Sequence, residues 1–185
     1  MHPMFEEQVV PRLQKEGIFP EIDCYLQIRT AGIGESTVAE KVEHLFKGKD
    51  ALIVGYCAHA GMVDIRLSSL DSDVLNDEDL HSLADACRDA LGEDFVCLGD
   101  RTIAEVIFRE LRNLDKTLAV AESCTGGLLS SSFTEIPGIS KVFHGGAVCY
   151  HNDAKVQMLD VPESMLEQHG AVSEEVAIAM ATGAC

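Results

Sequence analysis

The sequence is poor in positive charge. Its 185 residues include 14 lysines and arginines against 31 aspartates and glutamates, which gives a formal net charge of −17 at pH 7. Proteins that bind nucleic acid or an anionic membrane surface usually present a basic patch or stripe. The composition therefore argues against nucleic acid and against a membrane as partners.

Long hydrophobic runs are also absent. No stretch of about 18 apolar residues, the length that spans a bilayer, occurs in the chain. Residues 1–7 lack the basic and then apolar pattern of a signal peptide, so we expect a cytoplasmic protein. A hydrophobic content of 46% with 24% charged residues is typical of packed domains, and the length allows one domain or two small ones.

The seven cysteines form no metal or redox motif. The shortest spacing between two of them is ten residues, from Cys87 to Cys97, so no CxxC pair exists. An odd number of cysteines also argues against a disulfide framework. We expect reduced, mostly buried cysteines and no metal or cofactor. Only Cys124, which lies in a glycine-rich turn, needs a second interpretation.

Short strands and helices alternate in residues 14–100. Period-two alternation predicts four strands, near residues 22–28, 51–57, 62–69 and 94–98. Helical spacing of apolar residues predicts helices at residues 5–13 and after Glu35, Asp77 and Thr102. This pattern indicates an α/β (α+β) fold.

Residues 117–185 contain fewer predicted strands than helices. Apolar runs predict one strand at residues 117–122 and another at 144–150. Helices are predicted to begin near Leu128, Asn152, Ser173 and Pro162, the last with proline at its first position. Because a two-stranded sheet is marginal on its own, we expect this part of the chain to be an incomplete domain.

A glycine-rich turn joins the strand at residues 117–122 to the next helix. It contains Ser123, Cys124, Thr125, Gly126 and Gly127. Backbone N–H groups at such a turn can bind an anion, either a phosphate or a developing oxyanion, and glycines allow close approach. In the alternative interpretation, Ser123 or Thr125 caps the helix and the glycines serve packing. The residues alone leave both interpretations open.

A second polar segment follows the strand at residues 144–150. It reads Tyr150-His151-Asn152-Asp153-Ala154-Lys155. Lys141 and Lys155 are the two basic residues after Lys116, so they are the cations that this half offers to an anionic substrate. Ordinarily a lysine at the start of a helix is solvated, and isolated histidines such as His144 and His151 have structural roles.

Ordered motifs run through both halves of the chain. The second half contains AVAESCTGGLL at residues 119–129, PG at 137–138, GGAVCY at 145–150, Lys155, and HGAVSEEVA at 169–177. The first half contains IRT at residues 28–30, GIGE at 32–35 and VDIRL at 63–67. Together these motifs resemble the CinA family of competence/damage-inducible proteins.

The resemblance implies a domain organisation. Residues 1–13 are similar to the exit from the family's N-terminal domain, and residues 14–100 are similar to its KH-type middle domain. Residues 101–185 are similar to the first part of its C-terminal domain, a three-layer α/β amidase. Because that amidase domain is expected to be incomplete, we expect this chain to turn over substrate slowly or not at all.

The resemblance also implies a reaction. The family's C-terminal domain is a nicotinamide-nucleotide amidohydrolase, or NMN deamidase, of pyridine nucleotide salvage, which converts NMN and water to nicotinate mononucleotide and ammonia. By motif, Ser123 and Lys155 form its catalytic Ser–Lys pair. The implied substrate-binding residues are Glu122, Cys124, Thr125, Gly126, Gly127, Tyr150 and Asn152. The implied partner is a small-molecule nucleotide, and we expect a homo-oligomer, most simply a dimer.

Three alternatives stay open. Cys124 is a rival nucleophile, because a thiol beside a helix N-terminus is often reactive. A catalytically inactive CinA-like chain could instead act as a binding or interaction module. A KH-type module would hold RNA at residues 32–35, but that loop has no lysine or arginine, and residues 1–116 carry 12 basic against 23 acidic side chains.

Overall fold

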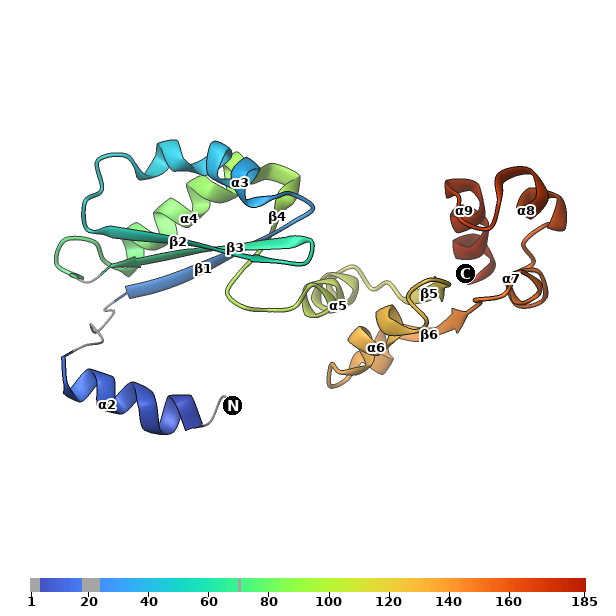
Figure 1. The fold of residues 1–185 in the computed structure, drawn as a ribbon, viewed down its shortest axis with the longest axis horizontal. Coiled ribbons are helices and arrows are strands. Elements are labelled where there is room, and N and C mark those ends of the chain that lie inside the picture. Colours follow the sequence, from blue (N-terminus) through green and yellow to red (C-terminus); the bar gives the residue numbers. More distant parts are fainter. Residues whose placement is uncertain (1–3, 18–23, 70) are drawn as a thin grey trace. The chain divides into compact units, whose positions relative to one another are not determined.

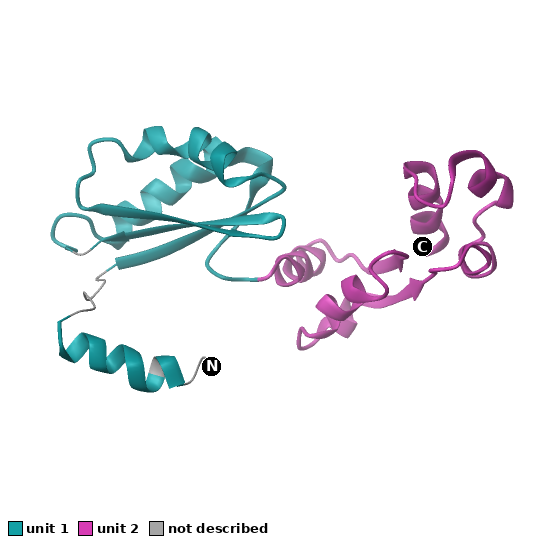
Figure 2. Ribbon diagram, in the orientation of Figure 1, with its two compact units in different colours: residues 1–101 teal, residues 102–185 magenta. Residues whose placement is uncertain are grey.

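The structure, a computed structural model, describes residues 4–17, 24–69 and 71–185. The chain divides into two compact units, residues 1–101 and residues 102–185 (Figure 2). Both units combine helices and strands, which confirms the predicted α+β class. In the described ranges, none of the helices is both long enough and apolar enough to cross a membrane.

The first unit contains a four-stranded antiparallel sheet with the strand order β2-β3-β1-β4. Its strands are β1 (Cys24–Ala31), β2 (Leu52–His59), β3 (Met62–Ser69) and β4 (Phe95–Leu98). The four predicted strands are thus confirmed with small shifts at their ends, although residues 22–23 lie outside the described residues. The predicted helix at residues 5–13 is present as a π-helical turn, η1 (Phe5–Val9), followed by α2 (Val10–Lys15).

Two helices cover one face of this sheet (Figure 1). They are α3 (Glu35–Val42), extended by the 3₁₀ turn η2 (Glu43–Phe46), and α4 (Asp77–Leu91), which leads through η3 (Gly92–Asp94) into β4. The Asn76 side chain caps α4 by accepting the N–H groups of Glu78 and Asp79. The helix predicted after Asp77 is thus confirmed, and its buried side chains form an apolar stripe with helical spacing: Leu80, Leu83, Ala84, Cys87 and Leu91.

The opposite face of the sheet holds a buried ion pair. Arg29 of β1 and Asp64 of β3 are direct cross-strand neighbours. The guanidinium donates from Nε and Nη2 to the two carboxylate oxygens at 2.8 and 2.9 Å, and Asp64 is 2% exposed. Arg29 Nη1 also donates to the carbonyl oxygens of Asp100 and Arg101. The pair therefore joins the central strands to the segment that follows β4.

The second unit is built around a two-stranded parallel sheet of β5 (Leu118–Glu122) and β6 (Phe143–Val148). The other elements are the helices α5 (Ile103–Asn113), α6 (Leu128–Thr134), α7 (Asn152–Leu159), α8 (Glu163–His169) and α9 (Glu174–Gly183), and the 3₁₀ turn η4 (Ile139–Lys141). Pro162 is the N-cap of α8, so the helix begins at Glu163, one residue later than predicted.

Alternate residues of β5 face two different apolar clusters. Val120 packs with Ala104 of α5 and Phe133 of α6, whereas Ala121 packs against a cluster from the segments around α7, α8 and α9. This arrangement places helices on both faces of the small sheet, as expected for part of a three-layer α/β domain.

We predict that the Arg29–Asp64 pair is a main stabilising contact of the first unit. The replacement Asp64→Ala leaves a largely buried guanidinium without its counter-ion, so the free energy of unfolding should fall by about 3 kcal/mol. Arg29 also holds the pKa of Asp64 below its usual value through their hydrogen bonds. Urea denaturation at pH 7 measures the loss.

The matched control is Asp85→Ala. Asp85 pairs with Arg88 on the surface of α4, where both side chains are about half exposed or more. Such a pair contributes less than about 1 kcal/mol. Equal losses in the two variants would contradict the assignment of the buried pair.

Candidate functional site

The site lies at the carboxyl ends of β5 and β6. Since the two strands are parallel, the segments that follow them leave from the same edge of the sheet. The segment after β5 contains Ser123, and the segment after β6 leads into α7, which carries Lys155. Lys155 Nζ lies 3.2 Å from Ser123 Oγ, although the two residues are 32 positions apart. The structure therefore brings together the two residues of the predicted catalytic pair.

Lys155 is buried among neutral acceptors. Lys155 is 1% exposed. Its Nζ atom lies 3.0 Å from the carbonyl oxygen of Cys149 and 3.2 Å from the carbonyl oxygen of Tyr150. Among the described residues, no carboxylate lies within 4.0 Å of Nζ. The Nζ atom therefore has three oxygen atoms within hydrogen-bond distance, two from backbone carbonyl groups and one from the Ser123 hydroxyl.

Glu122, the last residue of β5, holds the turn from the inside. It is 2% exposed and accepts five hydrogen bonds. Oε2 accepts from Thr125 Oγ1 and from the N–H groups of Gly127 and Leu129, at 2.7, 3.1 and 2.9 Å. Oε1 accepts from the N–H and hydroxyl of Ser130, at 2.9 and 2.5 Å.

These bonds keep Glu122 ionised. Burial raises the pKa of the carboxyl group, but the hydrogen bonds from Ser130, Thr125 and Leu129 outweigh burial and lower its pKa to about 2. The carboxylate thus lies as a fixed negative charge at the N-terminus of α6.

The predicted anion site at the turn therefore loses the donors at the start of α6, while the prediction for the N–H groups of Cys124 and Thr125 stays a prediction. The N–H groups of Gly127, Leu129 and Ser130 are already taken by Glu122. The alternative, a cap from Ser123 or Thr125, is wrong, because the N-cap is Gly127 and its φ of 103° is in the left-handed region. Sequence analysis named Glu122 as a substrate-binding residue, but the structure uses its buried carboxylate to accept hydrogen bonds from the turn and from α6.

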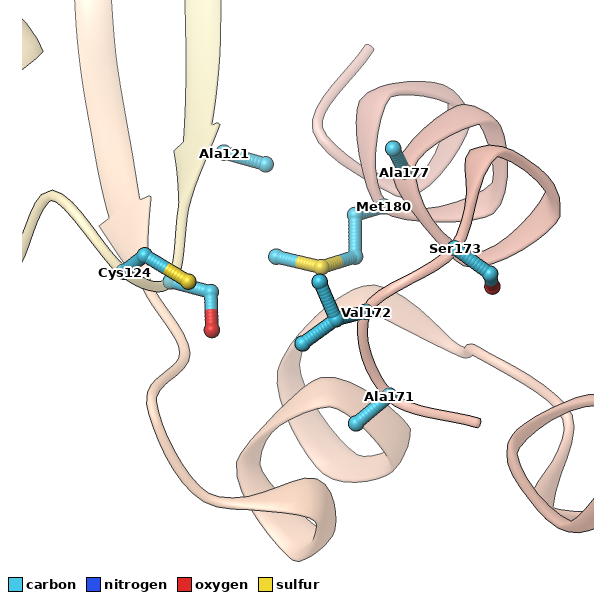
Figure 3. Close-up of a pocket in the computed structure, with 8 residues that line it drawn as sticks. Ala121, Cys124, Ala171, Val172, Ser173, Ala177 and Met180 are labelled. Carbon is cyan, nitrogen blue, oxygen red and sulfur yellow. The ribbon is translucent and has the colours of Figure 1, made fainter. Parts of the chain in front are cut away.

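A cavity of about 200 Å³ is lined in part by Ser123. Ala121 and Cys124 lie on one side of it, and residues of α9 and of the segment before α9 lie on the other (Figure 3). The lining of that second side is mostly small or apolar: Ala171, Val172, Ser173, Ala177 and Met180. The cavity therefore offers a small and largely apolar space next to the Ser123 hydroxyl.

The other predicted site residues take different positions. Cys124 is an exposed free thiol on the cavity wall. Thr125, Gly126 and Gly127 form the turn. Tyr150 is 74% exposed and presents its carbonyl oxygen to Lys155.

Asn152 is the exposed first residue of α7. Neither Tyr150 nor Asn152 is among the residues that line this cavity. No group of three or more His, Cys, Asp or Glu side chains in the described residues could hold a metal ion.

Two family models match the chain, one in each unit. Residues 27–96 match the model described as the damage-inducible protein CinA KH domain. Residues 100–185 match the model described as the CinA C-terminal domain. Together these models cover most of the sequence.

Curated relatives carry names of the same family. A CinA-like protein of Parasynechococcus marenigrum is 40% identical over 188 residues, which are 100% of this chain and 44% of the relative. A putative competence-damage inducible protein of Alkaliphilus metalliredigens is 38% identical over 99% of this chain and 44% of its own length. The chain thus spans less than half the length of the curated relatives that it matches.

A solved structure also matches part of the chain. It is the competence/damage inducible protein CihA from Agrobacterium tumefaciens, which is 46% identical, with a TM-score of 0.43 and coverage of 44% of this chain and 49% of that one. With both of its domains matched by family models and its relatives named accordingly, the chain belongs to the CinA family.

Proposed function

We propose that the second unit carries the amidohydrolase chemistry of a nicotinamide-nucleotide amidohydrolase. The reaction is NMN plus water to nicotinate mononucleotide and ammonia. The observation that carries the chemistry is the buried Lys155 amine, 3.2 Å from Ser123 Oγ and surrounded by carbonyl oxygens. The choice of NMN comes from the resemblance of residues 119–155 to the family's amidase domain.

Ser123 acts as the nucleophile in this mechanism. Its Oγ attacks the carboxamide carbon, and its proton passes to the neutral Lys155 amine. The tetrahedral intermediate then collapses, the C–N bond breaks, and the Lys155 ammonium returns a proton to the leaving ammonia. Water hydrolyses the resulting nicotinyl ester of Ser123, again with Lys155 as base, and nicotinate mononucleotide leaves.

The cavity fits the reacting end of this substrate. In NMN the nicotinamide ring is a planar pyridinium cation whose charge is spread over the ring, and the wall from Val172 to Met180 offers the faces of the ring an apolar surface beside Ser123. A ring in this cavity would present its carboxamide to the nucleophile. Cys124 lines the same cavity, but the side chain within hydrogen-bond distance of Lys155 Nζ is the Ser123 hydroxyl, at 3.2 Å.

We predict that Ser123 and not Cys124 is the nucleophile. Ser123→Ala should reduce NMN hydrolysis by about 10³-fold or more, since it removes the attacking atom. Cys124→Ser should keep most of the activity, because the cavity and the Ser123–Lys155 contact stay in place. Because we expect slow turnover by this chain, ammonia release from NMN is measured with both substitutions in a full-length protein that contains these residues, and the opposite ranking would assign the reaction to the thiol.

We also predict that Lys155 acts as a base rather than as a binding charge. Lys155→Arg should lose nearly as much activity as Lys155→Ala, because a guanidinium stays protonated and cannot accept the serine proton. Lys141→Ala is the control, since Lys141 is exposed and lies in η4. An arginine variant that kept most of the turnover would contradict the role of base.

A further inference from the structure

The second unit contains a buried acid whose five hydrogen bonds all go to the turn and helix that follow it. We propose that Glu122 is a positioning residue for the nucleophile. Its carboxylate fixes the turn of residues 123–127 and leaves the N–H groups of Cys124 and Thr125 as donors to the tetrahedral oxyanion. The proposal rests on the acyl-transfer chemistry of Ser123, but not on NMN as the substrate.

The two oxygens of Glu122 hold both ends of the turn. Oε2 binds Thr125 Oγ1 and the Gly127 N–H inside the turn, and Oε1 binds Ser130 in the first turn of α6. Ser123 follows Glu122 directly, so the backbone that carries its hydroxyl is connected to this bonded group by one peptide unit. A rotation of the turn would break several of these bonds together.

The contact with Ser130 has space only because β6 carries a glycine opposite it. A Cβ atom at Gly146 would collide with the Ser130 hydroxyl and crowd Val120. The hydroxyl that binds Glu122 Oε1 is therefore packed against the sheet backbone. Glycine at position 146 therefore allows α6 to lie close enough to the sheet for Ser130 to bind the Glu122 carboxylate.

The arrangement also determines which backbone donors are available to a substrate. Glu122 occupies the N–H groups at the start of α6, and the Gly126 N–H donates to the Ser123 carbonyl oxygen at 3.1 Å. Within the described residues, no acceptor takes the N–H of Cys124 or of Thr125. In the chain these two groups follow the nucleophile by one and two residues, and an oxyanion hole requires donors close to the attacking atom.

The pH dependence of stability gives one test. In the folded protein the pKa of Glu122 is lowered from 4.5 to about 2, so its contribution is fully present above pH 4.5 and is lost as the pH falls towards 2. The difference in unfolding midpoint between the wild type and Glu122→Gln should therefore be constant at neutral pH and shrink across that acidic range. A difference that does not change with pH would overturn the ionised carboxylate as the holding group.

The decisive test measures the reactivity of Ser123 without NMN. An alkyl fluorophosphonate forms a bond from Ser123 Oγ to phosphorus, fluoride leaves, and the serine proton passes to Lys155. Ser123→Ala provides the blank. At a temperature well below unfolding, Glu122→Gln should react at least about tenfold more slowly than the wild type, because the nucleophile and the donors are displaced.

Two further variants make the result unambiguous. Glu135→Gln, at the exposed C-cap of α6, removes the same charge and should react within about twofold of the wild type. If Glu122→Gln does not fold, Ser130→Ala decides, because it removes one bond to Oε1 and should slow labelling several-fold. If a folded Glu122→Gln variant is labelled as fast as the wild type, the proposal is overturned. If Glu122→Gln does not fold, labelling of Ser130→Ala at the wild-type rate overturns it. Labelling of Ser123 measures the positioning role whether or not this chain releases ammonia from NMN, so a failure of the proposed substrate is distinguishable from a failure of this proposal.

Discussion

The parallel pairing of β5 with β6 is the constraint on which the candidate site depends. It places the carboxyl ends of both strands at one edge, where the turn after β5 presents Ser123 and the segment after β6 returns through α7 to present Lys155. Ser123 and Lys155 are 32 positions apart in the sequence. Their contact therefore exists only when this sheet and both following segments are formed.

A buried acid, Glu122, and a buried amine, Lys155, lie near Ser123, and the two do not form an ion pair with each other. Glu122 is satisfied by N–H and hydroxyl donors, whereas Lys155 faces the carbonyl oxygens of Cys149 and Tyr150. A direct ion pair would favour the protonated lysine, which cannot act as a base. Because Glu122 is held by backbone donors, the turn contains a buried carboxylate without supplying a counter-ion to Lys155.

Sequence reasoning succeeded where the signal was local and periodic. The stripe on α4 follows from helical spacing, and the strands β1 to β4 follow from alternation and turn residues. The contacts of Glu122 with Ser130 and of Arg29 with Asp64 could not be predicted in this way. The first depends on how the chain folds back after a glycine turn, and the second on the register between two strands 35 residues apart.

Two basic side chains of the first unit, Arg29 and Lys41, form ion pairs within that unit. Arg29, on the face of the sheet that α3 and α4 leave uncovered, is 12% exposed and is fully engaged with Asp64 and two carbonyl groups. Lys41 of α3 pairs with Asp94 at 2.7 Å. These two cations neutralise acidic groups of their own unit, so they are not available to the phosphates of a nucleic acid. Their engagement supports our proposal of a small-molecule site at Ser123 over the alternative of RNA binding by the KH-type unit.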